Sequence, residues 1–321
     1  MIIGHRKILK DLQVLAGSGN LSQSYLFFGP SMVGKRTAAM AFAKFLEKRE
    51  LAVPHKGEVL QDAKVIDLTY MKELNAKTKD SIGIDVAREI RNYLNDRPAA
   101  SLRRTLIIDD AEMLTTEAQN ALLKVTEEPP ANSLIIFIAS DPDAIVPTIL
   151  SRVQKIYFGP IAETDIVKWL ETELSNSREL ESLKNDEMAV RKEDRKGDIL
   201  KVKAAEAAKR SFGKPGLAWR LLFDEDLKER LVLAEKFLKM PVATRRDFIK
   251  ELIEPDDFSL RRFLEAVTLQ LAWFTLSDRQ GVEGQKNKIK FGPLWHKTLT
   301  LHDAAMNFGL NPRLQLENLL I

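Results

Sequence analysis

The first 160 residues alternate short apolar runs with amphipathic segments. The apolar runs show no polar alternation, as expected for parallel strands that are covered by helices on both faces. The runs predicted as strands are Tyr25–Phe28, Val65–Leu68, Thr105–Ile108, Leu134–Ala139 and Ile156–Phe158. The pattern therefore predicts an α/β domain built on a parallel sheet.

After Pro160 the pattern changes and predicts helices only. Residues Glu171–Arg210 are dense in charged side chains around sparse apolar ones, which is typical of solvated helices. Helix breakers follow in Ser211–Gly216 (SFGKPG), and a further helical region starts at about residue 225. The apolar residues from Phe263 to Phe274 are numerous enough for a helical core, although some of them could face a neighbouring chain instead.

Composition narrows the possible chemistry. The chain has 321 residues, 45% of them hydrophobic, and a formal net charge of +3, so no bulk charge drives it toward nucleic acid. The two Arg pairs at 103–104 and 245–246 are typical of solvated faces. With no cysteine, disulfides, thiol catalysis and Cys-ligated zinc are excluded, and four scattered histidines do not favour a His-built metal site.

Two observations predict a cytoplasmic protein with no membrane partner. The opening MIIGHRKILK lacks the apolar core of a signal peptide, and the apolar run at 134–139 is too short to span a bilayer.

Residues 29–37 read GPSMVGKRT, in which Gly29, Gly34 and Lys35 have the spacing of a phosphate-binding loop. The loop follows a predicted strand and precedes a segment with helical periodicity. Backbone N–H groups, a helix N-terminus and the Lys35 charge would therefore meet a phosphate at one point. The alternative is a strand-to-helix turn with a structural role only.

The residues that would hold Mg²⁺ depart from the usual pattern. Arg36 stands where a Ser or Thr hydroxyl normally reaches the metal, and Thr37 would point about 100° further around the helix. Asp109 and Asp110 end the predicted strand in TLIIDDAEML (105–114), a position from which carboxylates hold Mg²⁺ and orient water. As an alternative, the two aspartates belong to a turn or a helix N-cap.

Further motifs follow in a specific order. Residues 115–130 (TTEAQNALLKVTEEPP) predict a helix with Thr115 or Thr116 near its start and a proline pair at its end. The strand LIIFIAS and the segment TILSR at 148–152 come next. Together with the loop and the aspartates, this order resembles the clamp-loader branch of the AAA+ ATPases, whose members show A-Q-N-A-L-L-K, E-E-P-P and T-I-x-S-R in this arrangement. The resemblance covers nearly the whole chain, from IIGH at 2–5 through SIGIDVAREIR at 81–91 to NPRLQLENLLI at 311–321.

The resemblance implies three domains. Residues 1–160 would form a P-loop AAA+ nucleotide-binding-like α/β domain, residues 161–224 a small helical lid, and residues 225–321 an all-helical collar. Through such collars five subunits of the family associate as an open, pentameric ring.

The resemblance also assigns site residues. Gly4 and His5 match the turn that contacts adenine, and Ser140 matches the sensor of the γ-phosphate. Arg152, after Ser151, matches the arginine that reaches across to the ATP of a neighbouring subunit.

Departures from the family indicate a non-motor subunit of the bacterial DNA polymerase III clamp loader. Gly216 stands where motor subunits carry a lid arginine, Arg36 removes a metal ligand, and Asp110 is shorter than the usual Glu. We therefore expect weak or absent ATPase activity. If ATP binds, we expect it to bind weakly or in a structural role, with Mg²⁺ bound beside it. We expect no zinc. Expected partners are the other loader subunits and, through the assembly, the sliding clamp and primer-template DNA. The alternatives are a motor subunit in which Thr37 supplies the hydroxyl, and an unrelated P-loop NTPase.

Overall fold

The computed structural model describes residues 2–55, 57–73, 82–176, 193–254, 258–276, 291, 294–302, 304–305 and 310–319. Parts of three segments used in the sequence analysis lie outside these residues, namely 81, 177–192 and 320–321. The chain divides into two compact units, Met1–Trp219 and Arg220–Ile321. The division into three domains stays a prediction.

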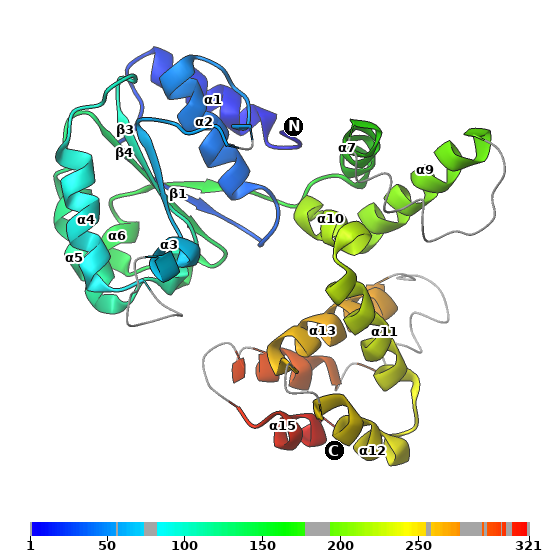
Figure 1. Cartoon of the computed structure of the whole chain (residues 1–321). Coiled ribbons are helices and arrows are strands. Elements are labelled where there is room, and N and C mark those ends of the chain that lie inside the picture. Colours follow the sequence, from blue (N-terminus) through cyan, green and yellow to red (C-terminus); the bar gives the residue numbers. More distant parts are fainter. Residues whose placement is uncertain are drawn as a thin grey trace. The chain divides into compact units, whose positions relative to one another are not determined.

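The first unit contains a parallel sheet of five strands in the order β2-β3-β4-β1-β5, which confirms the predicted fold class (Figure 1). The strands are β1 (Ser24–Phe28), β2 (Ala63–Ile66), β3 (Arg104–Ile108), β4 (Ser133–Ala139) and β5 (Gln154–Tyr157). β4 is buried along its whole length, which accounts for its unbroken apolar sequence.

The strands β2 and β5 both begin and end earlier than predicted. β2 ends at Ile66 because Asp67 accepts a hydrogen bond from the Tyr70 N–H at 2.8 Å and so begins helix α3 (Leu68–Glu73). β5 lies at the edge of the sheet, where Gln154 and Lys155 are exposed, so apolar content did not mark its start.

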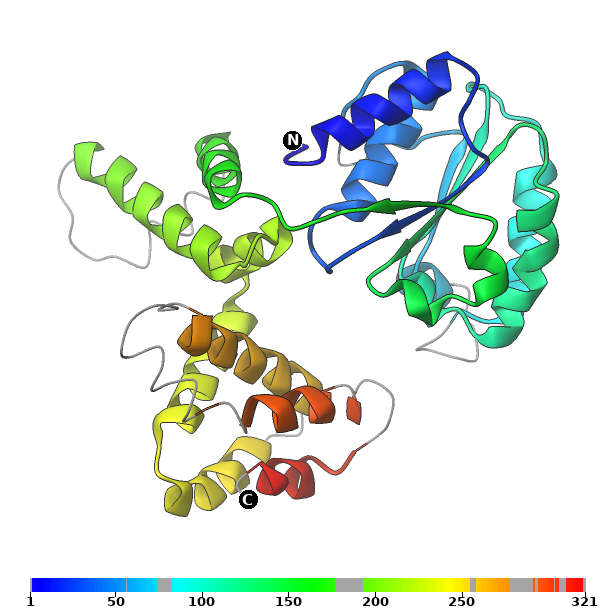
Figure 2. The same ribbon diagram turned by 180° about the vertical axis from the view of Figure 1, so that it is seen from behind.

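Helices cover both faces of the sheet (Figure 2). α1 (Arg6–Gly17) and α2 (Lys35–Lys48) pack on the face that receives Tyr25 and Phe27. α4 (Ile84–Asn95), α5 (Thr116–Glu127) and the short α6 (Pro147–Leu150) pack on the face that receives Leu26. α5 begins as predicted, with Thr115 accepting a hydrogen bond from the Ala118 N–H. Two short 3₁₀ helices, η1 (Ala111–Met113) and η2 (Pro142–Ala144), follow β3 and β4.

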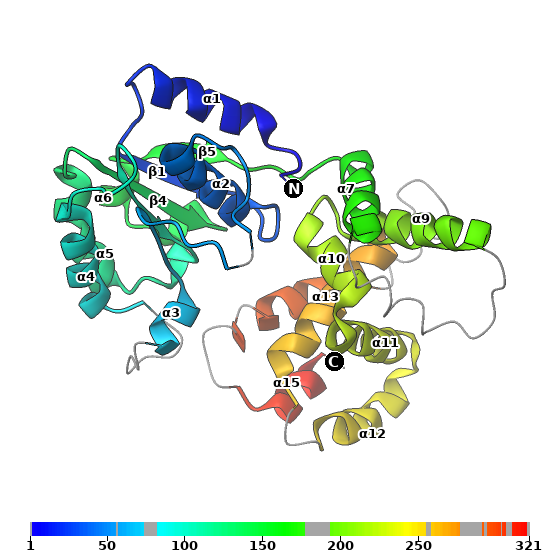
Figure 3. The same ribbon diagram turned by 45° about the horizontal axis from the view of Figure 1, so that its top comes forward.

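Among the residues described after β5, the regular elements are all helices, as predicted. α7 (Glu163–Asn176) and α9 (Glu193–Arg210) lie side by side, and α10 (Pro215–Phe223) comes next (Figure 3). The boundary between the two compact units falls within α10.

The second unit is built from α11 (Glu225–Lys239), α12 (Val242–Ile253), α13 (Leu260–Leu276) and α15 (Pro312–Asn318). α11 packs on α13, and α12 packs on α15. Phe263, Leu264, Val267 and Leu271 are buried, as predicted for a helical core, whereas Trp273 and Phe274 at the end of the run are only partly buried. Within the described parts of both units, no helix is both long enough and apolar enough to cross a membrane.

Candidate functional site

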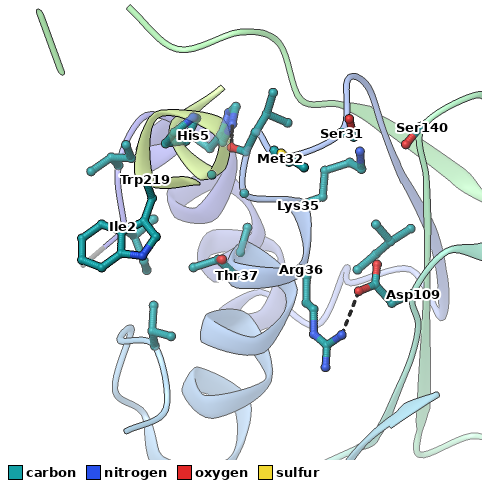
Figure 4. Close-up of a pocket in the computed structure, with 18 of the residues that line it drawn as sticks. Ile2, His5, Ser31, Met32, Lys35, Arg36, Thr37, Asp109, Ser140 and Trp219 are labelled. Atoms are coloured by element: carbon teal, nitrogen blue, oxygen red, sulfur yellow. Dashed lines mark hydrogen bonds and ion pairs between the residues drawn. The ribbon is translucent and has the colours of Figure 1, made fainter. Parts of the chain in front are cut away.

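A cavity of about 680 Å³ lies at the carboxyl ends of the strands in the first unit (Figure 4). The loop after β1, the aspartates after β3 and Ser140 after β4 converge on it, as parallel strands dictate. Of the predicted site residues, the structure brings seven to the cavity wall: His5, Gly34, Lys35, Thr37, Asp109, Asp110 and Ser140.

The loop from residue 29 to 37 has the backbone of a tight strand-to-helix turn. Gly29 has φ 135° and lies so close to β5 that a Cβ there would meet the Phe158 carbonyl oxygen at 2.2 Å. Gly34 has φ 101° and begins helix α2 without a side-chain cap, so the first N–H groups of that helix face the loop. Met32 also has a left-handed backbone, with φ 63°, which a residue with a Cβ rarely adopts.

Lys35 is turned back onto its own loop. Its Nζ donates hydrogen bonds to the carbonyl oxygens of Gly29 at 2.6 Å and Pro30 at 2.8 Å, and the residue is only 7% exposed. Burial lowers the pKa of Lys35, while the neighbouring Glu112 and Asp109 act in the opposite direction. The ammonium group is thus committed to backbone carbonyls and would have to leave them to contact a phosphate.

Arg36 pairs with two carboxylates at the ends of neighbouring strands. Its guanidinium lies 2.7 Å from Asp67 and 3.1 Å from Asp109, both of which are largely buried (Figure 4). Burial alone would raise the pKa of Asp67, but hydrogen bonds from the Tyr70 N–H and from Arg36 outweigh burial and lower it. A fixed cation therefore occupies the face of Asp109 where Mg²⁺ would be expected. Thr37 points to another side of α2, away from Asp109.

Asp110 follows in a left-handed backbone, with φ 51° and ψ 48°. Burial, then the charges of Asp109 and Glu112, raise the pKa of Asp110 to about 6. The predicted carboxylate pair is therefore electrostatically unequal, because Asp109 is neutralised by Arg36 and Asp110 is not.

Glu112 was not singled out from the sequence, although it lines the cavity. Its Oε1 accepts a hydrogen bond from the Ser140 N–H at 3.2 Å, and its Oε2 is buried with no partner among the described residues. Four carboxylates and three cations lie in this region, namely Asp67, Asp109, Asp110 and Glu112 with Lys35, Arg36 and Lys214. The excess of negative charge disfavours a polyphosphate.

Gly4 and His5 lie beside the loop. Gly4 has φ 65° and packs against Ile161, so that a Cβ would meet the Ile161 side chain at 2.8 Å. The Nε2 of His5 lies 3.1 Å from the Val33 carbonyl oxygen, and its ring packs edge-on against Phe158. Burial lowers the pKa of His5, although the hydrogen bond to Val33 acts in the opposite direction.

Two tryptophans that were not predicted as site residues also line the cavity, Trp169 on α7 and Trp219 on α10. Their ring centroids lie 5.8 Å apart, and the Trp169 indole N–H donates to Glu173 at 3.2 Å. The chain has only four tryptophans, and that scarcity was the one sequence signal that could have drawn attention to them.

Arg152, Gly4 and Gly29 are not among the residues that line this cavity, although Gly4 and Gly29 are close to it in the chain. Arg152 comes from another part of the first unit. It follows α6, is exposed, and pairs with Glu127 of α5 at 2.7 Å. Its Nη1 also donates to the Thr148 carbonyl oxygen at 2.5 Å and to the Ser151 hydroxyl at 3.2 Å. These contacts hold the guanidinium at the surface, outside the wall of the chain's own cavity.

Comparison with known proteins bears on the family of the chain. A family model described as DNA polymerase III, delta subunit matches residues 4–162. The DNA polymerase III subunit tau of Bacillus subtilis (strain 168) is 34% identical over 169 residues, which cover 52% of this chain and 30% of the relative. The DNA polymerase III subunit delta' of Escherichia coli (strain K12) is 34% identical over 103 residues, which cover 32% of this chain and 31% of that relative.

The sequence matches to tau and to related gamma/tau subunits span less than a third of those relatives' own length. The fold also matches a crystal structure of a DNA polymerase III gamma subunit-related protein from Thermotoga maritima, with a TM-score of 0.51. The match covers 96% of this chain and 97% of the Thermotoga maritima chain. At 22% identity, that likeness concerns the fold alone. Taken together, the family model and the sequence relatives show that the chain belongs to the clamp-loader family of DNA polymerase III subunits.

Proposed function

We propose that the chain is a non-motor, delta-prime-type subunit of the DNA polymerase III clamp loader, which helps to load the sliding clamp onto primed DNA. The observation that carries the proposal is the ion pairing of Arg36 with Asp67 and Asp109. P-loop ATPases hold Mg²⁺ between a loop hydroxyl and a strand-end aspartate. Here a guanidinium stands in place of the hydroxyl and pairs with the aspartate, so Mg²⁺ would have to displace Arg36 to reach Asp109.

The rest of the site supports weak binding without turnover. The N–H groups at the start of α2 could still hold a phosphate, and Lys35 and Ser140 are close enough to the cavity to contribute. When bound with ATP, Mg²⁺ would supply charge neutralisation at the phosphates. Lys35, however, is engaged by two carbonyl groups, and the surrounding carboxylates outnumber the cations. We therefore propose that ATP binds weakly to this site and that Mg²⁺ does not change the affinity of the site for ATP.

Arg152 is proposed to act on a neighbouring subunit. Its guanidinium is exposed, already oriented by Glu127 and Thr148, and outside its own cavity. An arginine at the edge of one subunit can neutralise charge on a phosphoryl group that is bound to the neighbouring subunit. The proposed partners are the other subunits of a pentameric loader and, through them, the clamp and primer-template DNA.

The test is the substitution Arg152→Ala in the assembled loader. Since comparable arginines accelerate hydrolysis by about 10³–10⁵, we expect the DNA-dependent ATPase rate of the assembly to fall by at least about tenfold. The isolated variant should keep its fold, because the side chain is exposed. Steady-state phosphate release with primed DNA measures the effect.

Arg313→Ala provides a matched control, because Arg313 also forms one exposed ion pair, with Glu317. It should leave the rate unchanged. Equal rates for wild type and Arg152→Ala in a fully assembled loader would contradict the role of Arg152 in trans.

The second candidate is a motor subunit. Two observations favour it: Thr37 lines the cavity, and the relatives include tau and gamma/tau subunits. Titration of the isolated chain with a fluorescent ATP analogue, with and without Mg²⁺, separates the two candidates. Tight Mg²⁺-dependent binding, with hydrolysis that Lys35→Ala abolishes, would establish the motor and overturn the non-motor proposal.

A further inference from the structure

The carbonyl groups of the loop bind donors from three separate parts of the first unit. Lys35 donates to Gly29 and Pro30, and His5 contacts the carbonyl of Val33. The carbonyl of Met32 accepts a hydrogen bond of 3.1 Å from the backbone N–H of Gly216. Gly216 is the second residue of α10, so its N–H has no partner within that helix. The free end of α10 is therefore bonded to the loop.

The contact between α10 and the loop is backbone against backbone. A Cβ at Gly216 would meet the Met32 Cβ at 3.0 Å and the Met32 carbonyl oxygen at 3.3 Å. Met32 keeps a left-handed backbone, with φ 63°, which is unfavourable for a residue with a Cβ. Such conformations persist where the surroundings determine them. Figure 4 shows the yellow-green ribbon of α10, which carries Trp219, beside the loop at His5 and Met32.

A second contact fixes the other side of the start of α10. Phe212 and Gly213 form a left-handed turn with φ 52° and 79°. The Gly213 carbonyl accepts a hydrogen bond from the Ile161 N–H at 2.8 Å, and a Cβ at Gly213 would meet the Pro160 side chain at 2.6 Å. The start of α10 is thus held both by the segment that leaves β5 and by the loop.

We propose that the contact between Gly216 and Met32 is a latch, which holds α10 on the phosphate-binding loop in the absence of nucleotide. A ligand shifts the position of an element only by its different affinity for the two positions. Because the latch is made by the chain's own backbone, α10 is already in place, and nucleotide has little left to change. The proposal concerns the conformation of the isolated chain and stands whether or not Arg152 acts on a neighbour.

Amide hydrogen exchange of the full chain, read by mass spectrometry, tests the latch. In the wild type, residues 29–37 and 212–219 should exchange equally slowly with and without ATP and Mg²⁺. Gly216→Val should make both segments exchange about tenfold faster or more, because the added side chain separates the two backbones. Strands β3 and β4 should exchange at the wild-type rate, which shows that the sheet is intact.

Gly17→Val is the matched control, since a Cβ at Gly17 would meet nothing within 4 Å. If Gly216→Val fails to fold, Gly216→Ala introduces the same contact with a single methyl group. Combining it with Met32→Gly removes the nearest atom, the Met32 Cβ, so the double variant should recover slow exchange, with Met32→Gly alone as its reference.

Two results would overturn the latch. One is fast exchange of residues 29–37 and 212–219 in the wild type that becomes slow only with ATP. The other is unchanged exchange of both segments in a folded Gly216→Val chain. Neither result bears on the ATPase measurements with Arg152→Ala, so failure of the latch and failure of the proposed function can be told apart.

Discussion

At the scale of the residue, Arg36 sets the charge of the site. It replaces a small hydroxyl with a guanidinium whose reach spans two strand ends, and it pairs with Asp67 and Asp109 while remaining half exposed itself. The planar guanidinium can bind two carboxylates at once in fixed directions, whereas the ammonium group of lysine is a point charge without such directions. The residue at this position therefore decides whether Asp109 is available to Mg²⁺.

Arg36→Thr should introduce Mg²⁺ dependence. With the guanidinium gone and a hydroxyl in the usual position, Asp109 becomes available to a metal, and ATP-analogue affinity should rise about tenfold on adding Mg²⁺, or ~1.4 kcal/mol. Fluorescence titration with and without Mg²⁺ measures this change. Arg36→Lys, which keeps the charge, should show no such dependence; an equal gain in both variants would contradict the argument from charge.

Asp110→Asn should stabilise the chain at neutral pH. The pKa of Asp110 rises from 3.8 to about 6 on folding, so its ionised form is less stable in the folded chain than in the unfolded one. The penalty is absent below pH ~4, where the carboxyl is protonated in both states, and it is complete above pH ~6. Because the residue is partly exposed, we expect a gain on the order of 1 kcal/mol.

Urea unfolding at pH 8 and at pH 4 measures the effect of Asp110→Asn. Asn also tolerates the left-handed backbone at this position, so the substitution tests charge alone. A gain of the same size at both pH values would show that the carboxylate charge is not its cause.

The sequence predicted the loop and Asp109 because both belong to local motifs, but it could not predict their pairing. Asp67 lies 31 positions from Arg36 and reaches it only because β2 lies next to β3, with Ile66 beside Ile108. Strand order depends on how the whole sheet assembles, so short sequence motifs do not predict it. For the same reason the sequence showed neither the inward turn of Lys35 nor the approach of Gly216 to Met32.

At the scale of the element, one glutamine joins α5 to the segment that carries Arg152. Gln119 is 4% exposed, and its Nε2 donates to the carbonyls of Leu114 and Ala144, each at 3.2 Å. Its Oε1 accepts from the Val146 N–H at 2.7 Å, directly before α6. Gln119 therefore sets the start of α6, whose other end leads into Arg152.

Gln119→Leu should destabilise the first unit by about 1–3 kcal/mol, because one buried and two partly buried backbone groups lose their hydrogen-bond partner. The neighbouring Asn120 is exposed on the same helix, and Asn120→Ala should change stability by less than about 0.5 kcal/mol. Urea unfolding of both variants provides the comparison. Equal stability of Gln119→Leu and wild type would show that water or other groups replace these hydrogen bonds.

The elements themselves were predictable where their surroundings are simple. β1, β3 and β4 are buried on both faces, and their apolar runs marked them to within one residue. α5 was predicted from its threonine cap and its terminal prolines. The bounds of β5 were harder to predict because an edge strand needs no apolar side chain toward solvent. The end of β2 was harder to predict because Asp67 caps helix α3 and does not continue the strand.

At the scale of the whole molecule, the chain divides into two compact units with separate apolar interiors. In the second unit, Phe263 is 1% exposed, and its ring centroid lies 5.9 Å from that of Phe237 and 6.1 Å from that of Phe258. Damage to this cluster should be confined to the helices of the second unit.

Phe263→Ala should destabilise the second unit by about 3–5 kcal/mol through the cavity it leaves. Amide exchange in α11 and α13 should accelerate, while that of β3 and β4 in the first unit stays at the wild-type rate. Val232→Ala, at a position that is 67% exposed on α11, serves as the control and should change neither. Parallel acceleration in the sheet would mean that the two units unfold as one.

The pairing of Arg36 with Asp67 and Asp109 also determines how the folded chain responds to its surroundings. A metal ion or a nucleotide stabilises a protein by mass action, so its contribution rises and falls with the free concentration of the ligand. Arg36 is joined to the chain by covalent bonds, and its effective concentration beside the two carboxylates is constant. The pairing of both carboxylates with Arg36 is therefore insensitive to depletion of Mg²⁺ or ATP, and dilution cannot remove it.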